Sequence, residues 1–236
     1  MDPGWRTDWS SDPLRARDWR VAPPAPPARV TSRLIAVNVA VFLVQATRED
    51  ALLAAFALWP AGRFYVPELH AVVGFHVWQL VTYAFLHASF AHIFLNMLAL
   101  RIFGRDVEAT LGARRYLALY AAAILSAAVV QLAVVSAAGG EPYPTLGASG
   151  GVFGVLLAFG MLYPRRIVTL LFPPIPMPAW LFVTLYAALE LVQGVVGTAA
   201  GIAHFAHLGG MAGAWWMLRR WRRRGPEEEN GSARRG

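Results

Sequence analysis

The sequence of 236 residues contains no cysteine and no lysine. Without cysteine, the chain can form no disulfide bond, no thiolate metal site and no thiol nucleophile. Charged residues are also scarce at 15%, whereas 57% of the residues are apolar and the mean hydropathy is +0.45. Since an ordinary soluble domain is about one-quarter charged, the composition excludes a disordered, collagen-like or nucleic-acid-binding chain as the overall class. It indicates a single membrane domain.

Apolar runs bounded by charged or turn residues predict an all-α membrane protein with six transmembrane helices. The predicted spans are Thr31–Ala46, Phe90–Val107, Tyr116–Ala138, Ala148–Tyr163, Met177–Val196 and His204–Trp221. They form one domain over residues 31–222, flanked by polar tails at 1–30 and 223–236 that we expect to be disordered and cytoplasmic. The aromatic link Arg48–Leu86 is predicted to lie on the membrane surface, with a further short span as the alternative.

Arginine supplies all the positive charge, and its distribution predicts the orientation. Arginines occur in both tails and in the links after the second and fourth spans, whereas the links at 139–147 and 197–203 carry none. Because arginine accumulates on the cytoplasmic side, both termini are expected in the cytoplasm, with the chain in the inner (plasma) membrane. The arginine cluster at 219–224 directly follows an apolar segment, which indicates membrane orientation and no nucleic-acid partner.

The fourth predicted span is short. Its roughly 16 residues rise about 24 Å, against a hydrocarbon core of about 30 Å. Its beginning should therefore lie below the outer surface, and the preceding stretch, 139–147, should enter the membrane as irregular backbone. Such backbone is tolerated only where protein buries it or where it lines a water-filled cavity. We expect a wet cavity that opens to the outside.

Ser149 lies at the beginning of this span, within Thr145-Leu-Gly-Ala-Ser-Gly-Gly151. Glycine allows close backbone approach, and the first turn of a helix leaves amide groups unpaired. The hydroxyl is thus expected beside free N–H donors and the positive end of the helix dipole. An ordinary N-cap is the alternative interpretation.

His207 lies in the sixth span, followed by Gly209 and Gly213. Small residues four apart let two membrane helices approach closely, so His207 should reach a neighbouring helix. A packing or hydrogen-bonding role is the alternative. We interpret His204, three residues earlier, as a loop or capping residue.

His92 and Asn96 are four residues apart in the second span and therefore share a face. Both side chains can donate hydrogen bonds, as a developing oxyanion requires, and interhelical hydrogen bonding is the alternative. The predicted orientation places His92, Ser149 and His207 at one depth. A serine, a histidine base and two donors at one depth satisfy the roles for acyl transfer.

Metal chemistry fits the sequence less well. The histidines lack the HExxH spacing of a metalloprotease, so we expect no metal site and no cofactor. Glu190, an acidic residue inside the fifth span, has no obvious partner in the sequence.

Taken together, these residues resemble the rhomboid family of intramembrane serine proteases, over roughly residues 33–222. The resemblance is carried by His92-x-x-x-Asn96, Gly147-Ala-Ser-Gly150, Ala206-His-Leu-Gly-Gly210 and the preceding segment Trp78–His87. It implies a six-helix bundle that cuts a substrate's transmembrane helix near the outer surface. Gly147 and Gly150 match the glycines around the family's serine.

The resemblance also implies a role for each site residue. Ser149 would be the nucleophile and His207 the general base and acid, as a dyad without an acid to orient the histidine. The Ser149 amide and the side chains of His92 and Asn96 would form the oxyanion site. Two positions depart from the family pattern: Gln79 stands where arginine often follows the tryptophan, and Phe153 stands where many members have tyrosine.

The sequence therefore predicts an intramembrane serine endopeptidase that acts on transmembrane segments without a cofactor. A non-proteolytic relative that binds membrane helices is the first alternative. A small transporter with Ser149, His207 and Glu190 as a relay is the second, although the sequence contains no apparent inverted repeat.

Overall fold

The computed structural model describes residues 28–139, 143–169, 173–196 and 201–223, and the side chains of 201–203 are not described. The predicted tails at 1–30 and 223–236 therefore lie outside the described residues, apart from the few that adjoin the first and last helices.

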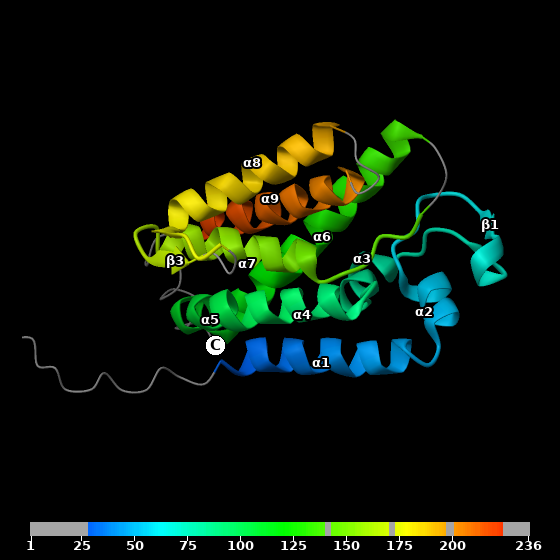
Figure 1. The fold of residues 1–236 in the computed structure, drawn as a ribbon, viewed down its shortest axis with the longest axis horizontal. Coiled ribbons are helices and arrows are strands. Elements are labelled where there is room, and N and C mark those ends of the chain that lie inside the picture. The colour runs from blue at the N-terminus through cyan, green and yellow to red at the C-terminus, as the bar shows by residue number, and fades with distance from the viewer. Residues whose placement is uncertain (1–27, 140–142, 170–172, 197–200, 224–236) are drawn as a thin grey trace, which may run out of the picture.

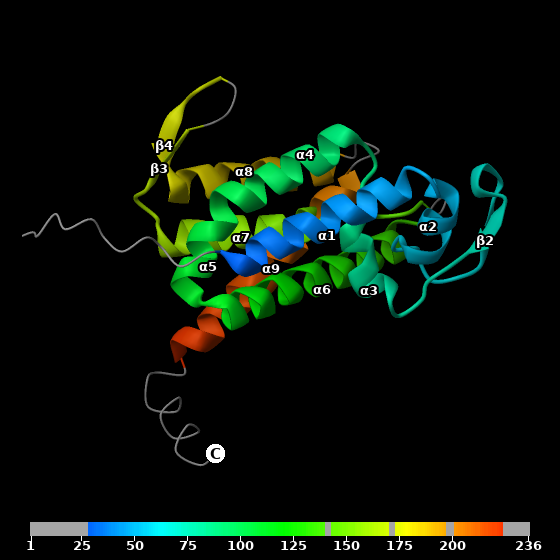
Figure 2. The ribbon, with the colours of Figure 1, turned by 90° about the horizontal axis from the view of Figure 1, so that it is seen from below.

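Each of the six predicted apolar segments forms a helix within a few residues of its expected bounds. These helices run side by side in one bundle (Figures 1 and 2). They are α1 (Arg29–Gln45), α4 (Phe90–Ala99) continued by η4 (Leu100–Gly104) and α5 (Arg105–Leu111), α6 (Ala113–Ala138), α7 (Ser149–Leu162), α8 (Ala179–Val196) and α9 (Gly201–Arg223).

Two of the described helices, α6 and α8, are long and apolar enough to cross a membrane on their own. A third candidate is the pair Gln79–Phe85 and Phe90–Leu111, which is bent by 98°. The helix that begins at Ser149 is apolar but has only 14 residues, so it rises about 21 Å. This length agrees with the prediction of a short fourth helix.

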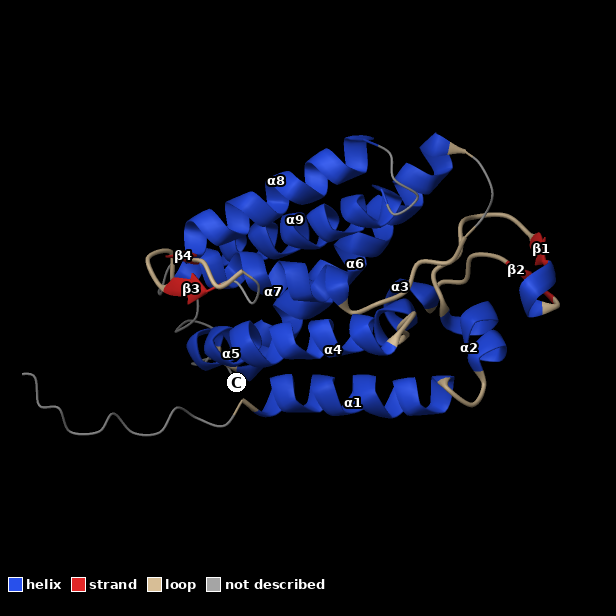
Figure 3. Cartoon of the chain, viewed as in Figure 1, coloured by secondary structure: helices blue, strands red, loops and turns tan. Residues whose placement is uncertain are grey.

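The link between α1 and α4 contains several short elements instead of one long helix. They are α2 (Glu49–Phe56), β1 (Phe64–Val66), η2 (Pro67–Leu69), β2 (Ala71–Val73), α3 (Gln79–Thr82) and η3 (Tyr83–Phe85). β1 and β2 form an antiparallel hairpin, and a second hairpin joins β3 (Ile167–Thr169) to β4 (Pro176–Pro178). The two hairpins lie at opposite ends of the bundle (Figure 3). The mostly helical architecture agrees with the predicted fold class, and the two hairpins are an addition, because three-residue strands leave no periodic pattern in the sequence.

Gln79 holds this link together from a fully buried position. Its side-chain oxygen accepts hydrogen bonds from the backbone nitrogens of Trp59 (3.3 Å) and His76 (3.1 Å). Its side-chain nitrogen donates to the carbonyl of Gly74 at 3.1 Å. A neutral amide supplies both donors and acceptors, so glutamine organises the link where the family often has arginine.

Close contacts between α6, α7 and α9 form the centre of the bundle. Gly209 faces Ser126 and Val130 of α6, and Gly213 faces Ala122 and Ser126 of the same helix. The predicted close approach of the last helix through these two glycines is confirmed. It brings the first turns of α9 beside the beginning of α7.

The end of the bundle opposite this contact is rich in charge. The Glu108 carboxylate accepts hydrogen bonds from the backbone nitrogens of Val30 (2.9 Å) and Thr31 (2.8 Å), which begin α1. Nearby, Arg166 forms an ion pair with Asp106 at 2.6 Å. The beginning of α1 and the end of α9 lie at this same end (Figures 1 and 2).

Candidate active site

The segment before α7 is irregular backbone that the rest of the protein encloses. Thr145 and Leu58 exchange two backbone hydrogen bonds of 2.9 Å, and the Gly147 nitrogen donates to the Tyr83 carbonyl at 2.9 Å. Gln131 of α6 donates to the Thr145 hydroxyl at 2.8 Å. The prediction of irregular backbone before the short helix is confirmed for 143–147, and residues 140–142 lie outside the described part. These bonds fix the position at which α7 begins.

Gly147 is required by both its backbone and its surroundings. Its φ of +127° is a conformation that residues with a side chain rarely adopt. A Cβ at Gly147 would lie 2.6 Å from His92 Cε1 and 3.7 Å from Ser149 Oγ. The absence of a side chain at 147 therefore leaves a small space between His92 of α4 and Ser149 of α7.

Ser149 and His207 meet across the contact between α7 and α9. The Ser149 hydroxyl oxygen lies 2.8 Å from His207 Nε2. The ring of Phe153, one turn after the serine, stacks on the imidazole with 4.3 Å between centroids and 7° between planes. Phenylalanine thus packs on the histidine at the position where many family members have tyrosine.

His92 and Asn96 lie one turn apart on α4, beside the space at Gly147. Asn96 is buried, and its side-chain nitrogen donates to the His92 carbonyl at 2.9 Å. An amide nitrogen carries two protons, so one remains for another acceptor. His92 Nδ1 accepts from the Ala88 nitrogen at 3.4 Å. We infer that its Nε2 carries the proton, and this nitrogen would lie 2.8 Å from a Cβ at Gly147.

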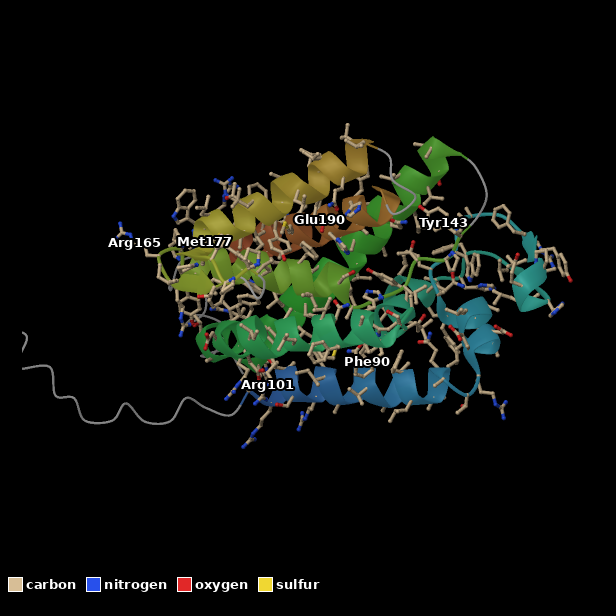
Figure 4. The ribbon with its side chains drawn as sticks, in the orientation of Figure 1. Phe90, Arg101, Tyr143, Arg165, Met177 and Glu190 are labelled. Atoms are coloured by element: carbon tan, nitrogen blue, oxygen red, sulfur yellow. The ribbon has the colours of Figure 1, made fainter. Side chains whose placement is uncertain are left out.

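Glu190 corrects two predictions: that no acid orients His207, and that His204 is a loop or capping residue. No partner of Glu190 is apparent in the sequence. Glu190 Oε2 lies 2.9 Å from His207 Nδ1 and 2.5 Å from His204 Nδ1. Figure 4 labels Glu190 where α8 faces α9. His204 is therefore no loop residue: it lies within α9 and shares a carboxylate with His207.

Sequence reasoning missed this cluster because Glu190 reaches the histidines only through the packing of α8 on α9. It lies 14 residues from His204 and 17 from His207, beyond any helical periodicity. The sequence did contain one signal of the cluster, the presence of Glu190 in an apolar span, because an ionisable side chain there is a functional candidate by default.

His87 is a second residue that sequence reasoning left without a role. It is almost fully buried, and its backbone nitrogen and carbonyl both bind the side chain of Gln45, at 3.0 and 2.8 Å. Its ring nitrogen Nε2 accepts from the Ala148 nitrogen at 3.5 Å. His87 therefore links α1 to the residue that immediately precedes Ser149.

The cluster of Glu190, His204 and His207 also has the donor set of a zinc site. Its three ligand atoms lie within 4.8 Å of one another. However, ligands bound tetrahedrally to zinc at about 2.0 Å lie about 3.3 Å apart, whereas the contacts here are 2.5 and 2.9 Å. The side chains are thus arranged as a hydrogen-bonded cluster.

Comparison of the sequence with known proteins identifies a family. The model of the Rhomboid domain matches residues 74–223. Rhomboid protein 1, mitochondrial, from Saccharomyces cerevisiae is 32% identical over 197 residues, which cover 78% of this chain and 51% of the relative. RHOMBOID-like protein 12, mitochondrial, from Arabidopsis thaliana is 34% identical, over 61% of this chain and 47% of the relative.

A bacterial relative is the Rhomboid protease GluP of Bacillus subtilis, with 38% identity over 79 residues, 34% of this chain and 14% of the relative. The chain spans about half the length of the first two curated relatives. The family model covers well over half of the 236 residues. This protein is a helical membrane protein that belongs to the rhomboid family.

Proposed function

We propose that the protein is an intramembrane serine endopeptidase that cleaves transmembrane segments of membrane proteins near the outer face of the bilayer. The observation that carries the proposal is the 2.8 Å contact between Ser149 Oγ and His207 Nε2 at the beginning of α7. A hydroxyl that contacts an imidazole nitrogen in this way can lose its proton as it attacks a carbonyl carbon. The relative from Bacillus subtilis is named a rhomboid protease, which agrees with this chemistry.

The reaction then proceeds in two halves. Ser149 Oγ forms a bond to the scissile carbonyl carbon while its proton passes to His207 Nε2. The tetrahedral intermediate collapses, the C–N bond breaks, and Nε2 returns the proton to the leaving amine. In the second half, His207 takes a proton from water, the resulting hydroxide attacks the acyl-enzyme, and the Ser149 hydroxyl is regenerated. No cofactor is needed for either half.

The oxyanion is proposed to bind in the space beside Gly147. The Ser149 amide begins α7, where backbone N–H groups lack intrahelical partners. His92 Nε2 and the second proton of Asn96 come from α4 on the other side of this space. Donors that are already in position stabilise the negative charge that develops on the carbonyl oxygen.

The membrane arrangement follows from the same proposal. Six spans, with the site at the end opposite the charged cluster of Glu108 and Arg166, would place Ser149 near the outer face and both termini in the cytoplasm. The link between α1 and α4 would then lie on the outer membrane surface. We propose the inner (plasma) membrane as the location, and fusions of reporter proteins to each terminus would test the orientation.

A fluorophosphonate probe tests the proposed chemistry directly. The purified full chain in detergent is expected to be labelled at Ser149, because the probe reacts only with an activated hydroxyl. Labelling is expected to disappear in His207→Ala, which retains the serine but lacks the base. Peptide mapping identifies the labelled residue. Absence of label in the folded wild-type protein, or undiminished label in His207→Ala, contradicts the proposal.

Replacing Asn96 with alanine tests the oxyanion site. Loss of one oxyanion donor typically lowers kcat by roughly 10²- to 10³-fold, and we expect that range for cleavage of a membrane-anchored substrate. Asn38→Ala is a matched control, since the Asn38 amide also donates to a carbonyl of its own helix, that of Leu34, at 2.8 Å. Asn38 lies on α1, away from Ser149, so its replacement should leave kcat unchanged. Equal losses in both variants would mean that Asn96 contributes only to packing.

One observation favours an alternative function, that of a small transporter with a proton relay. Ser149, His207, Glu190 and His204 form a continuous series of contacts, which could also pass a proton. The probe separates the two functions, because proton transfer through Ser149 requires no nucleophilic hydroxyl. A non-proteolytic protein that binds membrane helices would likewise remain unlabelled.

A further inference from the structure

We propose that Glu190 is a positioning residue that makes the Ser149–His207 pair a Ser-His-Glu triad, with His204 as a second donor to the same carboxylate. This inference rests on the proposed function. Its basis is the continuous geometry of the three side chains: Ser149 Oγ to His207 Nε2 at 2.8 Å, and His207 Nδ1 to Glu190 Oε2 at 2.9 Å. Both nitrogens of the imidazole are therefore occupied.

The geometry selects one tautomer of His207. To receive the serine proton, Nε2 must be unprotonated, so the proton of the neutral ring must be on Nδ1. An ionised carboxylate accepts hydrogen bonds and donates none, and Glu190 is placed to accept the proton of Nδ1. The carboxylate thus stabilises the tautomer in which Nε2 faces Ser149 as a base.

Stacking on Phe153 cannot select the orientation of the His207 ring that places Nε2 beside Ser149. Phe153 lies parallel to the His207 ring at 4.3 Å, which fixes the plane of the imidazole. A flip of the ring within that plane would exchange nitrogen and carbon positions without disturbing the stack. Only a partner in the ring plane distinguishes the two orientations, and Glu190 is such a partner. Phe153 and Glu190 therefore constrain different motions of the same side chain.

The surroundings of Glu190 indicate that its charge is used. The residue is buried, with 7% of its surface exposed, and it is the only charged residue of α8. Burying a carboxylate is unfavourable unless it is paired and hydrogen-bonded. Its two histidine partners lie on one face of α9, three residues apart, and both approach Oε2. When His207 accepts the serine proton and becomes a cation, the carboxylate already lies beside the new charge.

His204 holds the carboxylate from the other side. Its Nδ1 lies 2.5 Å from Glu190 Oε2, and its ring is nearly perpendicular to that of His207, at 84° with 6.2 Å between centroids. His204 does not contact Ser149 in this arrangement. It therefore acts on Ser149 only through Glu190 and the His207 ring, and its loss should have a smaller effect than the loss of the carboxylate.

Three substitutions at Glu190 test the proposal on the purified full chain in detergent. Glu190→Gln keeps the size and removes the charge, Glu190→Leu removes all polarity, and Glu190→Asp restores a carboxylate on a shorter side chain. We expect kcat for a membrane-anchored substrate to fall about 10²-fold or more in the first two, with KM unchanged and fluorophosphonate labelling slowed in parallel. Glu190→Asp should recover part of that loss, and His204→Phe should lose less than Glu190→Gln.

Glu108→Gln is the matched control. Glu108 is equally buried, with 5% exposed, and it holds the beginning of α1 at the far end of the bundle. This variant should lower the thermal unfolding temperature without changing the labelling rate of the folded fraction. If Glu190→Gln behaves in the same way, the role of Glu190 is structural and the proposal is overturned.

Two further results distinguish the possible failures. If wild-type Ser149 is labelled and Glu190→Gln is labelled at the same rate, the triad fails while the proposed protease function stands. If the folded wild-type protein is not labelled, the protease function itself fails.

Incubation with EDTA should leave the wild-type rate unchanged. A loss of activity that added zinc restores would assign the cluster to a metal and overturn the proposal.

Discussion

Ser149→Ala is expected to abolish cleavage of a membrane-anchored substrate, and His207→Ala is expected to do the same. In soluble serine proteases, the loss of either residue costs about 10⁶-fold in kcat, which would lie below detection here. The two losses should not add, because the base has no function without the nucleophile. The measurement is the cleavage of a substrate with one transmembrane helix, reconstituted with the purified protein in liposomes.

Ser136→Ala is the control for this experiment, because Ser136 is an exposed serine near the end of α6 and its replacement should leave cleavage unchanged. Ser149→Ala should retain the thermal unfolding temperature of the wild type within a few degrees, since it removes one polar contact. His207→Ala also removes the stack on Phe153 and a partner of the buried Glu190, so its cleavage is compared per amount of folded protein. Full cleavage by purified Ser149→Ala would falsify the mechanism.

The helices of the fold could be predicted because apolar composition determines them. In a chain with so few charged residues, the polar stretches between long apolar runs separate the helices, although glycines also occur inside α7 and α9. The predicted fifth span, Met177–Val196, differs from α8 by two residues at its beginning. The hairpins could not be predicted in this way, because their three-residue strands are set by contacts with neighbouring segments.

The candidate site was predictable only in part, for a related reason. Ser149, His92 and Asn96 carry local signals, namely glycines at a helix beginning and donors four residues apart. The pairing of Glu190 with His204 and His207 carries no local signal, because it depends on which face α8 presents to α9. An acid in an apolar helix could therefore be noticed in the sequence, but its partner could not be named.

Gln79 and Phe153, the two positions that depart from the family pattern, both hold neighbouring groups in place in this structure. Gln79 binds three backbone groups without a charge, and Phe153 stacks on His207 without a hydroxyl. The glycines between α7 and α9 admit no larger residue, since a Cβ at Gly210 would overlap the Gly150 carbonyl oxygen.

Gly210→Val is expected to break the contact between α7 and α9 and to abolish the fluorophosphonate labelling of Ser149. A Cβ at Gly210 would overlap the backbone carbonyl of Gly150, and ordinary contact begins only at 3.4 Å. A carbonyl within a helix cannot rotate away, so α9 must move from α7. Overpacking of this kind costs about 3 kcal/mol or more when the backbone must shift. Unfolding in detergent, followed by temperature or by added SDS, measures that loss.

The same shift should separate the nucleophile from its base. Ser149 lies next to Gly150, and His207 lies three residues before Gly210, so a displacement between the two glycines acts directly on the 2.8 Å contact of the pair. A misplacement of about 1 Å can cost 10²-fold in rate, in addition to the loss of folded protein. Gly194→Ala is the control, because its Cβ would meet only the ring of Phe205, at 3.0 Å, and a side chain can turn aside. If Gly210→Val retains wild-type stability and labelling, close contact between α7 and α9 is not what aligns Ser149 with His207.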